Sequence, residues 1–243
     1  MGTIDKMDVI EHKSQVIQYK TIRSDRRSIA ISVRPTREVI VRAPRQISDR
    51  ELERLVKSKA DWILTKLNEM PKHIVPSTEK QYKDGDEILF RGKEYTLRVQ
   101  KMYSISKSQI ILGAEEITII RKAGEKKEPK ELLLLWYKEQ AREFVLERIS
   151  FYSPLIKKPI GDVRIKSQKK RWGSCSSQGN LNFNWRIILM PDKMSDYIVV
   201  HEMCHLKYLN HSRSYWDSVA SILPDYKERE NWIKRNTFRL EML

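Results

Sequence analysis

The chain has 243 residues, 40% hydrophobic and 33% charged, and this composition excludes an intrinsically disordered or collagen-like protein. Its 47 Lys and Arg against 32 Asp and Glu give a net charge of +15, so we expect a surface that attracts acidic partners. With two cysteines, no apolar leader and no long apolar run, the sequence predicts a cytoplasmic protein without a disulfide framework, neither secreted nor embedded in a membrane.

The N-terminal half alternates apolar and polar residues in short runs. This period of two predicts strands at 16–19, 29–33 and 39–41. Ser48 and Glu51 then form a capping box before apolar residues at helical spacing, which predicts one helix near 48–70. Four more strands are expected at 87–90, 94–100, 108–112 and 116–121. We therefore predict a mainly β N-terminal region over 1–125.

The C-terminal half begins after a charged segment, 121–130. A wide apolar stripe predicts a helix over 132–155, packed against a sheet. Two strands follow at 163–169 and 180–189, with turn-forming residues 173–179 between them, and then helices at 192–206, 212–222 and 224–239. This order of elements predicts an α+β domain over 126–243, and no internal repeat is visible in the sequence.

Three of the five histidines lie within eleven residues, at His201, His205 and His211. The four-residue spacing of the first two places both imidazoles on one face of the predicted helix, about 40° apart, where two nitrogens can reach one metal ion. Glu202 lies about 100° further round the helix, too far to be a ligand but placed to reach a water on the metal. We therefore predict that Glu202 is the general base of a metal-dependent hydrolase.

A catalytic zinc site needs a third protein ligand, for which His211 is the first candidate. His211 can reach the ion only if the helix ends after His205 and the chain turns back, and Asn210 tolerates the left-handed backbone that such a turn can use. A carboxylate from the following helices is the alternative third ligand, and the candidates are Asp217, Glu228 and Glu230.

Several short motifs surround this cluster or precede it. They read KRWGSC at 170–175, NFNWR at 182–186, YIVVHEMCHL at 197–206, NHS at 210–212 and YW at 215–216, with RRSI at 26–29 and VIVRAP at 39–44 upstream. Together they resemble the YgjP-like metallopeptidases, which are zincins related to the SprT and WLM groups. The resemblance implies a zincin-like peptidase in which His201, His205 and His211 bind Zn²⁺. Glu202 would then activate a zinc-bound water to hydrolyse a protein or peptide substrate.

Two noncatalytic interpretations of the histidine cluster stay open. The helix histidines could be hydrogen-bonded without a metal, or a structural zinc ion could be closed by a fourth ligand. Cys204 points away from His205 on the helical wheel, whereas Cys175 could come close through folding. Because basic residues are frequent in the N-terminal strands, the alternative function is a noncatalytic, metal-stabilised basic module that binds nucleic acid.

A zincin-like peptidase also needs a strand that pairs with the substrate and a group that stabilises the oxyanion. We expect the strand at 179–186 to present its edge to an extended peptide. Tyr208, Tyr215 and Arg186 are the side-chain candidates for the oxyanion, and the metal alone is a further one.

Overall fold

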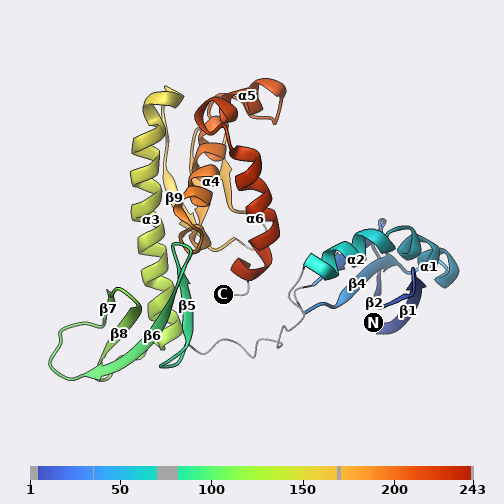
Figure 1. Cartoon of the computed structure of the whole chain (residues 1–243), viewed down its shortest axis with the longest axis horizontal. Helices are drawn as coiled ribbons and strands as arrows, with labels where there is room; N and C mark the ends of the chain where they lie inside the picture. The colour runs from blue at the N-terminus through green and yellow to red at the C-terminus, as the bar shows by residue number, and fades with distance from the viewer. Residues whose placement is uncertain (1–4, 35, 70–81, 169–170, 242–243) are drawn as a thin grey trace. The chain divides into compact units, whose positions relative to one another are not determined.

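The computed structural model describes residues 5–34, 36–69, 82–168 and 171–241, and the chain divides into two compact units (Figure 1). The first unit is Met1–Thr78, and the second is Glu79–Glu241. This division differs from the expected boundary between 125 and 126. The strands between 87 and 122 belong to the second unit because their apolar side chains share its core with the long helix that follows them.

The first unit is a four-stranded sheet with two helices. Its elements are β1 (Asp5–His12), β2 (Gln15–Ser24), β3 (Ala30–Val33), β4 (Val39–Pro44), α1 (Asp49–Ser58) and α2 (Ala60–Glu69). Strand β1 was not predicted, because it is specified by antiparallel pairing with β2 along its whole length rather than by its own pattern. The Ser48 hydroxyl accepts the Glu51 amide at the start of α1, as predicted. The one helix expected near 48–70 is divided into α1 and α2, because the backbone of Lys59 leaves helical geometry at φ −107°.

The second unit begins with another four-stranded sheet, and all four of its strands were predicted. They are β5 (Glu87–Phe90), β6 (Lys93–Met102), β7 (Gln109–Leu112) and β8 (Glu116–Lys122). The strand order β5-β6-β8-β7 repeats the order β1-β2-β4-β3 of the first sheet. In both sheets the central pair is parallel and the outer pairs are antiparallel. The sequence shows no repeat because the similarity lies in strand pairing rather than in residues.

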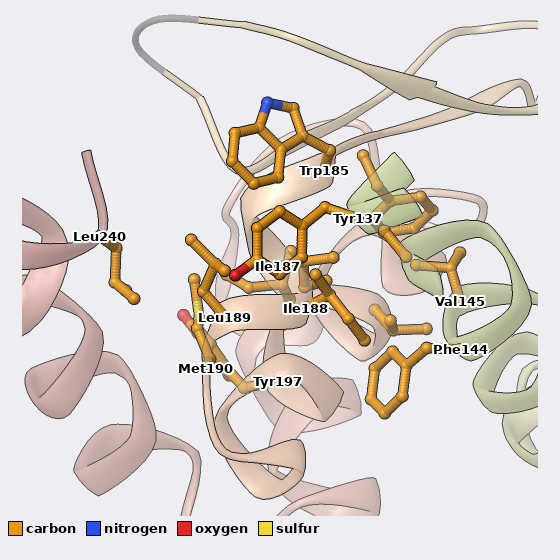
Figure 2. Packing of buried hydrophobic residues seen from close by; sticks show 14 of the residues in the cluster. Tyr137, Phe144, Val145, Trp185, Ile187, Ile188, Leu189, Met190, Tyr197 and Leu240 are labelled. Carbon is orange, nitrogen blue, oxygen red and sulfur yellow. The ribbon is translucent and has the colours of Figure 1, made fainter. Parts of the chain in front are cut away.

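The long helix α3 (Pro129–Ile156) and the 3₁₀ helix η1 (Trp185–Leu189) join this sheet to the rest of the second unit. Tyr137 of α3 donates its hydroxyl to the Leu89 carbonyl at 2.8 Å, and its ring stacks on Trp185 at 5.4 Å (Figure 2). The amide of Gly92, in the β5–β6 turn, donates to the Leu189 carbonyl of η1 at 3.0 Å. Gly92 has a φ of +78°, and a Cβ atom here would lie only 2.6 Å from Cγ of Pro191, so only glycine fits.

A three-stranded sheet lies between α3 and η1 in the chain. Its strands are β9 (Val163–Lys166), β10 (Gly173–Cys175) and β11 (Leu181–Asn184), in the order β10-β11-β9. The expected strand at 180–189 ends at Asn184, because the Asn184 side chain accepts the Arg186 amide and begins η1. The expected edge at 179–186 was wrong, since β11 is paired on both sides. The edge strands are β9 and β10, and β10 lies in a segment that was expected to form only a turn.

Three helices complete the chain, α4 (Asp192–Cys204), α5 (Arg213–Ile222) and α6 (Tyr226–Glu241). Helix α4 packs between α3 and α6 (Figure 1). Arg148 and Tyr152 of α3 hold Asp196 of α4 through hydrogen bonds of 2.6 and 2.9 Å, and Asp196 is only 8% exposed. This buried network fixes the helix that carries the first two histidines. None of the described helices combines the length and apolar character needed to cross a membrane.

Candidate metal centre

The three clustered histidines meet at the C-terminal end of α4. His201 lies in the last turn of the helix, His205 is its C-terminal cap, and His211 lies in the loop before α5. One ring nitrogen from each histidine lies within 4.8 Å of the other two. Within the described ranges, no other set of three His, Cys, Asp or Glu side chains is arranged to hold a metal. The alternative third ligands, Asp217, Glu228 and Glu230, are not part of the cluster.

The geometry of the ring nitrogens fits a divalent ion. Two nitrogens bound tetrahedrally at 2.0–2.1 Å from one ion lie roughly 3.3 Å apart, and the Nε2 atoms of His201 and His211 are 3.2 Å apart. Nδ1 of His205 lies 2.9 Å from the Tyr208 carbonyl oxygen, which can only accept a hydrogen bond. The proton is therefore on Nδ1, and Nε2 of His205 keeps its lone pair for a metal.

The helix histidines are also in the right protonation state for ligands. Burial, and then the neighbouring His205 and His211, lower the pKa of His201 to about 3. Burial also lowers the pKa of His205. Both rings are therefore neutral at pH 7, which is the form that binds a cation. Nδ1 of His201 is buried and has no hydrogen-bond partner in the described part of the chain.

The chain turns back toward His201 by tight turns after α4. The amides of Leu206, Lys207 and Tyr208 bond to the carbonyls of Met203 and Cys204 at 3.0–3.1 Å, which closes the end of the helix. The expected use of a left-handed Asn210 was wrong, because Asn210 is not among the described residues with positive φ. The reversal comes from backbone turns, so no residue of the loop needs an unusual conformation.

Stacked aromatic rings support the exposed ligand candidate. His211 stacks on Trp216 of α5, with centroids 5.5 Å apart and planes at 24°. Trp216 in turn stacks on Tyr226 of α6 at 5.4 Å and 18°. This three-ring stack limits the orientations of a side chain that solvent alone would leave mobile. No local pattern predicts a role for Trp216, and its only signal in the sequence is its place in a family-like motif.

Tyr215 is part of the support for the helix histidines. Its ring stacks on His205 at 4.6 Å, and its hydroxyl donates to the backbone carbonyl of His201 at 3.1 Å. The side chain is fully buried. Since its hydroxyl proton is already engaged, Tyr215 is a poor candidate for stabilising an oxyanion. Arg186, another candidate, has its guanidinium over the Trp185 ring at 4.6 Å.

Glu202 is buried beside the histidines, with 6% of its surface exposed. Burial raises the pKa of its carboxyl group to about 8, although the charge of Arg171 acts in the opposite direction. A carboxyl group poised near neutral pH is suited to proton transfer. The side chain lies against Gly173 of β10, where a Cβ atom would be 2.6 Å from Oε1 of Glu202. The sequence predicts Gly173 only as a turn former, and its local pattern gives no sign of this contact.

His12 and both cysteines lie outside the cluster. His12 bonds to Asp61 at 2.8 Å in the first unit, and His73 lies outside the described residues. Sγ of Cys204 is 3.7 Å from the Ser218 hydroxyl, and Cys175 is in β10. Neither thiol belongs to a metal-binding group in the described structure, and burial raises the pKa of both.

Comparisons with known proteins identify the family of this chain. The sequence matches a family model described as YgjP-like, metallopeptidase domain, over residues 27–236. It is similar to the crystal structure of the metallopeptidase zymogen of Pyrococcus abyssi abylysin, with 26% identity and a TM-score of 0.34, over 37% of this chain and 90% of that chain. A comparison with curated proteins found no match. Because the family model covers most of its length, the chain belongs to the YgjP-like family of metallopeptidase domains.

Proposed function

We propose that the chain is a zinc-dependent peptidase in which His201, His205 and His211 hold Zn²⁺ and Glu202 is the general base. The observation that carries this proposal is the convergence of three ring nitrogens within 4.8 Å of one another, beside a buried carboxyl group. Neutral imidazoles are the donors that zinc prefers in catalytic sites. No fourth protein ligand joins them among the described residues, which favours an open, catalytic site over a closed, structural one.

Glu202 would move the protons of the reaction. A bound divalent ion supplies a Lewis acid for the peptide carbonyl and a positive charge that favours the ionised form of Glu202. The Glu202 carboxylate then takes a proton from the attacking water and delivers it to the departing amine nitrogen. Its burial keeps bulk water from competing for that proton, and Gly173 leaves the space in which the carboxylate lies.

The edge strand β10 is the proposed binding surface for the substrate backbone. It pairs with β11 on one side, and no described strand pairs with its other side. An extended peptide that adds to this edge by main-chain hydrogen bonds would lie next to Glu202, because Gly173 of β10 contacts that side chain. This arrangement suits unfolded or extended protein segments.

The alternative function, a basic module that binds nucleic acid, stays a prediction. In the first unit, Arg23, Arg34 and Arg45 each form an ion pair with an acidic residue of the same unit. These pairs neutralise part of the charge that the alternative requires. A DNA affinity that falls steeply with salt would support it, and a flat response would count against it.

Metal analysis combined with hydrolysis of an unfolded protein tests the proposal. We expect one zinc per chain and metal-dependent hydrolysis in the wild type. Glu202→Gln should keep the zinc and lose hydrolysis, whereas His211→Ala should lose the zinc. His12→Ala is the matched control, because His12 lies in the first unit and should change neither quantity. Equal turnover by the wild type and Glu202→Gln would refute the assignment of the base.

A further inference from the structure

A cavity of about 330 Å³ opens beside the metal centre, on the side of His205. Its wall combines the segment after α3, the loop between β10 and β11, and the turn after α4. The lining residues that matter here are Lys158, Ser177, Gln178, Leu206 and Leu209. The volume admits any amino-acid side chain, and the proposed mechanism does not use it. Because His205 is one of its lining residues, a side chain in the cavity would lie next to the reacting bond.

One part of the wall offers hydrogen-bond donors without an acidic partner. Lys158 is exposed and makes no ion pair or hydrogen bond with a described residue. The Gln178 side-chain carbonyl oxygen accepts from the Asn180 side-chain amide at 3.5 Å, which leaves the Gln178 amide group to donate. The Ser177 hydroxyl is a third donor. No Asp or Glu of the described chain lines the cavity.

The other part of the wall is apolar. Leu206 is partly buried, whereas Leu209 is 72% exposed. Leu206 and Leu209 form the apolar part of the wall, and Lys158 adds positive charge. A side chain that matches this cavity has methylene groups near its base and a negative charge at its end.

We propose that this cavity binds the side chain of a substrate residue next to the cleaved bond and selects a carboxylate there, as in glutamate. The proposal rests on the proposed peptidase function. The methylene groups of glutamate would pack on Leu206 and Leu209, and its carboxylate would accept hydrogen bonds from Lys158, Gln178 and Ser177. A free C-terminal carboxylate offers the same chemistry without the aliphatic stem, so the experiment separates these two sources.

Matched peptides test this specificity on the full-length, zinc-loaded protein. The peptides share one cleavable sequence, carry a C-terminal amide, and differ only in having Glu, Gln or Lys beside the cleaved bond. A further Gln peptide has a free C-terminal carboxylate instead of the amide, and it ends at the point where this carboxylate can enter the cavity. For the wild type we expect kcat/KM to be about tenfold higher with Glu than with Gln, since a charge-assisted hydrogen bond is worth roughly that factor.

Lys158 variants connect the preference to the cavity. Lys158→Ala should abolish the preference for Glu over Gln, and Lys158→Glu should reverse it in favour of Lys. Lys126→Glu makes the same charge change before the start of α3, a helix of 28 residues and so about 42 Å long. It is the matched control and should keep the wild-type preference.

Three outcomes would overturn the proposal. They are equal rates with Glu and Gln in the wild type, an unchanged preference in Lys158→Glu, and selection of the free C-terminal carboxylate alone. If no peptide is hydrolysed in a metal-dependent way, the proposed function fails separately. The cavity proposal is then tested by fluorescence anisotropy, which measures the binding of labelled Glu and Gln peptides. Tighter binding of the Glu peptide that is lost in Lys158→Glu would support the proposal. Equal binding of the two peptides would overturn it.

Discussion

Because Glu202 is buried, we expect its ionised carboxylate to destabilise the metal-free protein at alkaline pH. The pKa of this group is about 8 in the folded protein, against an ordinary value of 4.5. The folded state therefore holds the proton more tightly than the unfolded chain. The contribution of this Glu202 proton to the stability of the folded protein is fully present below pH 4.5 and is lost as the pH rises through 8. Glutamine cannot ionise, so Glu202→Gln should stabilise the metal-free protein increasingly as the pH rises.

The expected size of the effect follows from the two pKa values. The difference between about 8 and 4.5 corresponds to on the order of 5 kcal/mol of unfolding free energy above pH 8. At about pH 6 the unfolded chain is already ionised but the folded one is not, and the difference is about 2 kcal/mol. The advantage of the variant should therefore grow by about 3 kcal/mol between pH 6 and pH 9.

Urea unfolding in the presence of EDTA measures this difference. Tryptophan fluorescence is a suitable signal, because of the six tryptophans only Trp62 lies in the first unit. Glu139→Gln makes the same chemical change at a position of α3 outside the site and should show no advantage that depends on pH. The titration of other groups cancels in the comparison with the wild type. If Glu202→Gln and the wild type lose stability in parallel from about pH 6 to pH 9, the reasoning is refuted.

Three further substitutions test the supports of the site and the core beneath it. Gly173→Ala places a methyl group where Oε1 of Glu202 is only 2.6 Å away, so the carboxylate must move; peptide hydrolysis should fall by about tenfold or more while zinc content, read by metal analysis, is unchanged. Trp216→Ala removes the ring on which His211 stacks and should weaken zinc binding by about 10–100-fold in competition with a chromophoric chelator, whereas Trp216→Phe should keep most of the affinity. Phe183→Ala leaves a cavity in a fully buried position and should cost about 3–5 kcal/mol in urea unfolding; a loss below about 1 kcal/mol would contradict the packing.

Features that depend on neighbouring residues could be predicted from the amino-acid sequence. Apolar periodicity predicted the four strands from β5 to β8 and the helix α3, because alternation and helical spacing reflect which face of a local element is buried. The spacing of His201, Glu202 and His205 predicted two rings on one helical face with a carboxyl group beside them. The structure brings His211 to the same place, as a third ligand requires.

Features that join distant segments were settled only by the fold. Whether β11 or β10 is the edge of its sheet is set by pairing with β9, which no local pattern records. The contact between Gly173 and Glu202, the stack of Trp216 on His211 and the cavity beside His205 likewise join separate segments. The local sequence determines which residue types are available and which face of each helix or strand is apolar. Packing between elements decides which of them meet, because burial and hydrogen bonding act on the folded chain as a whole.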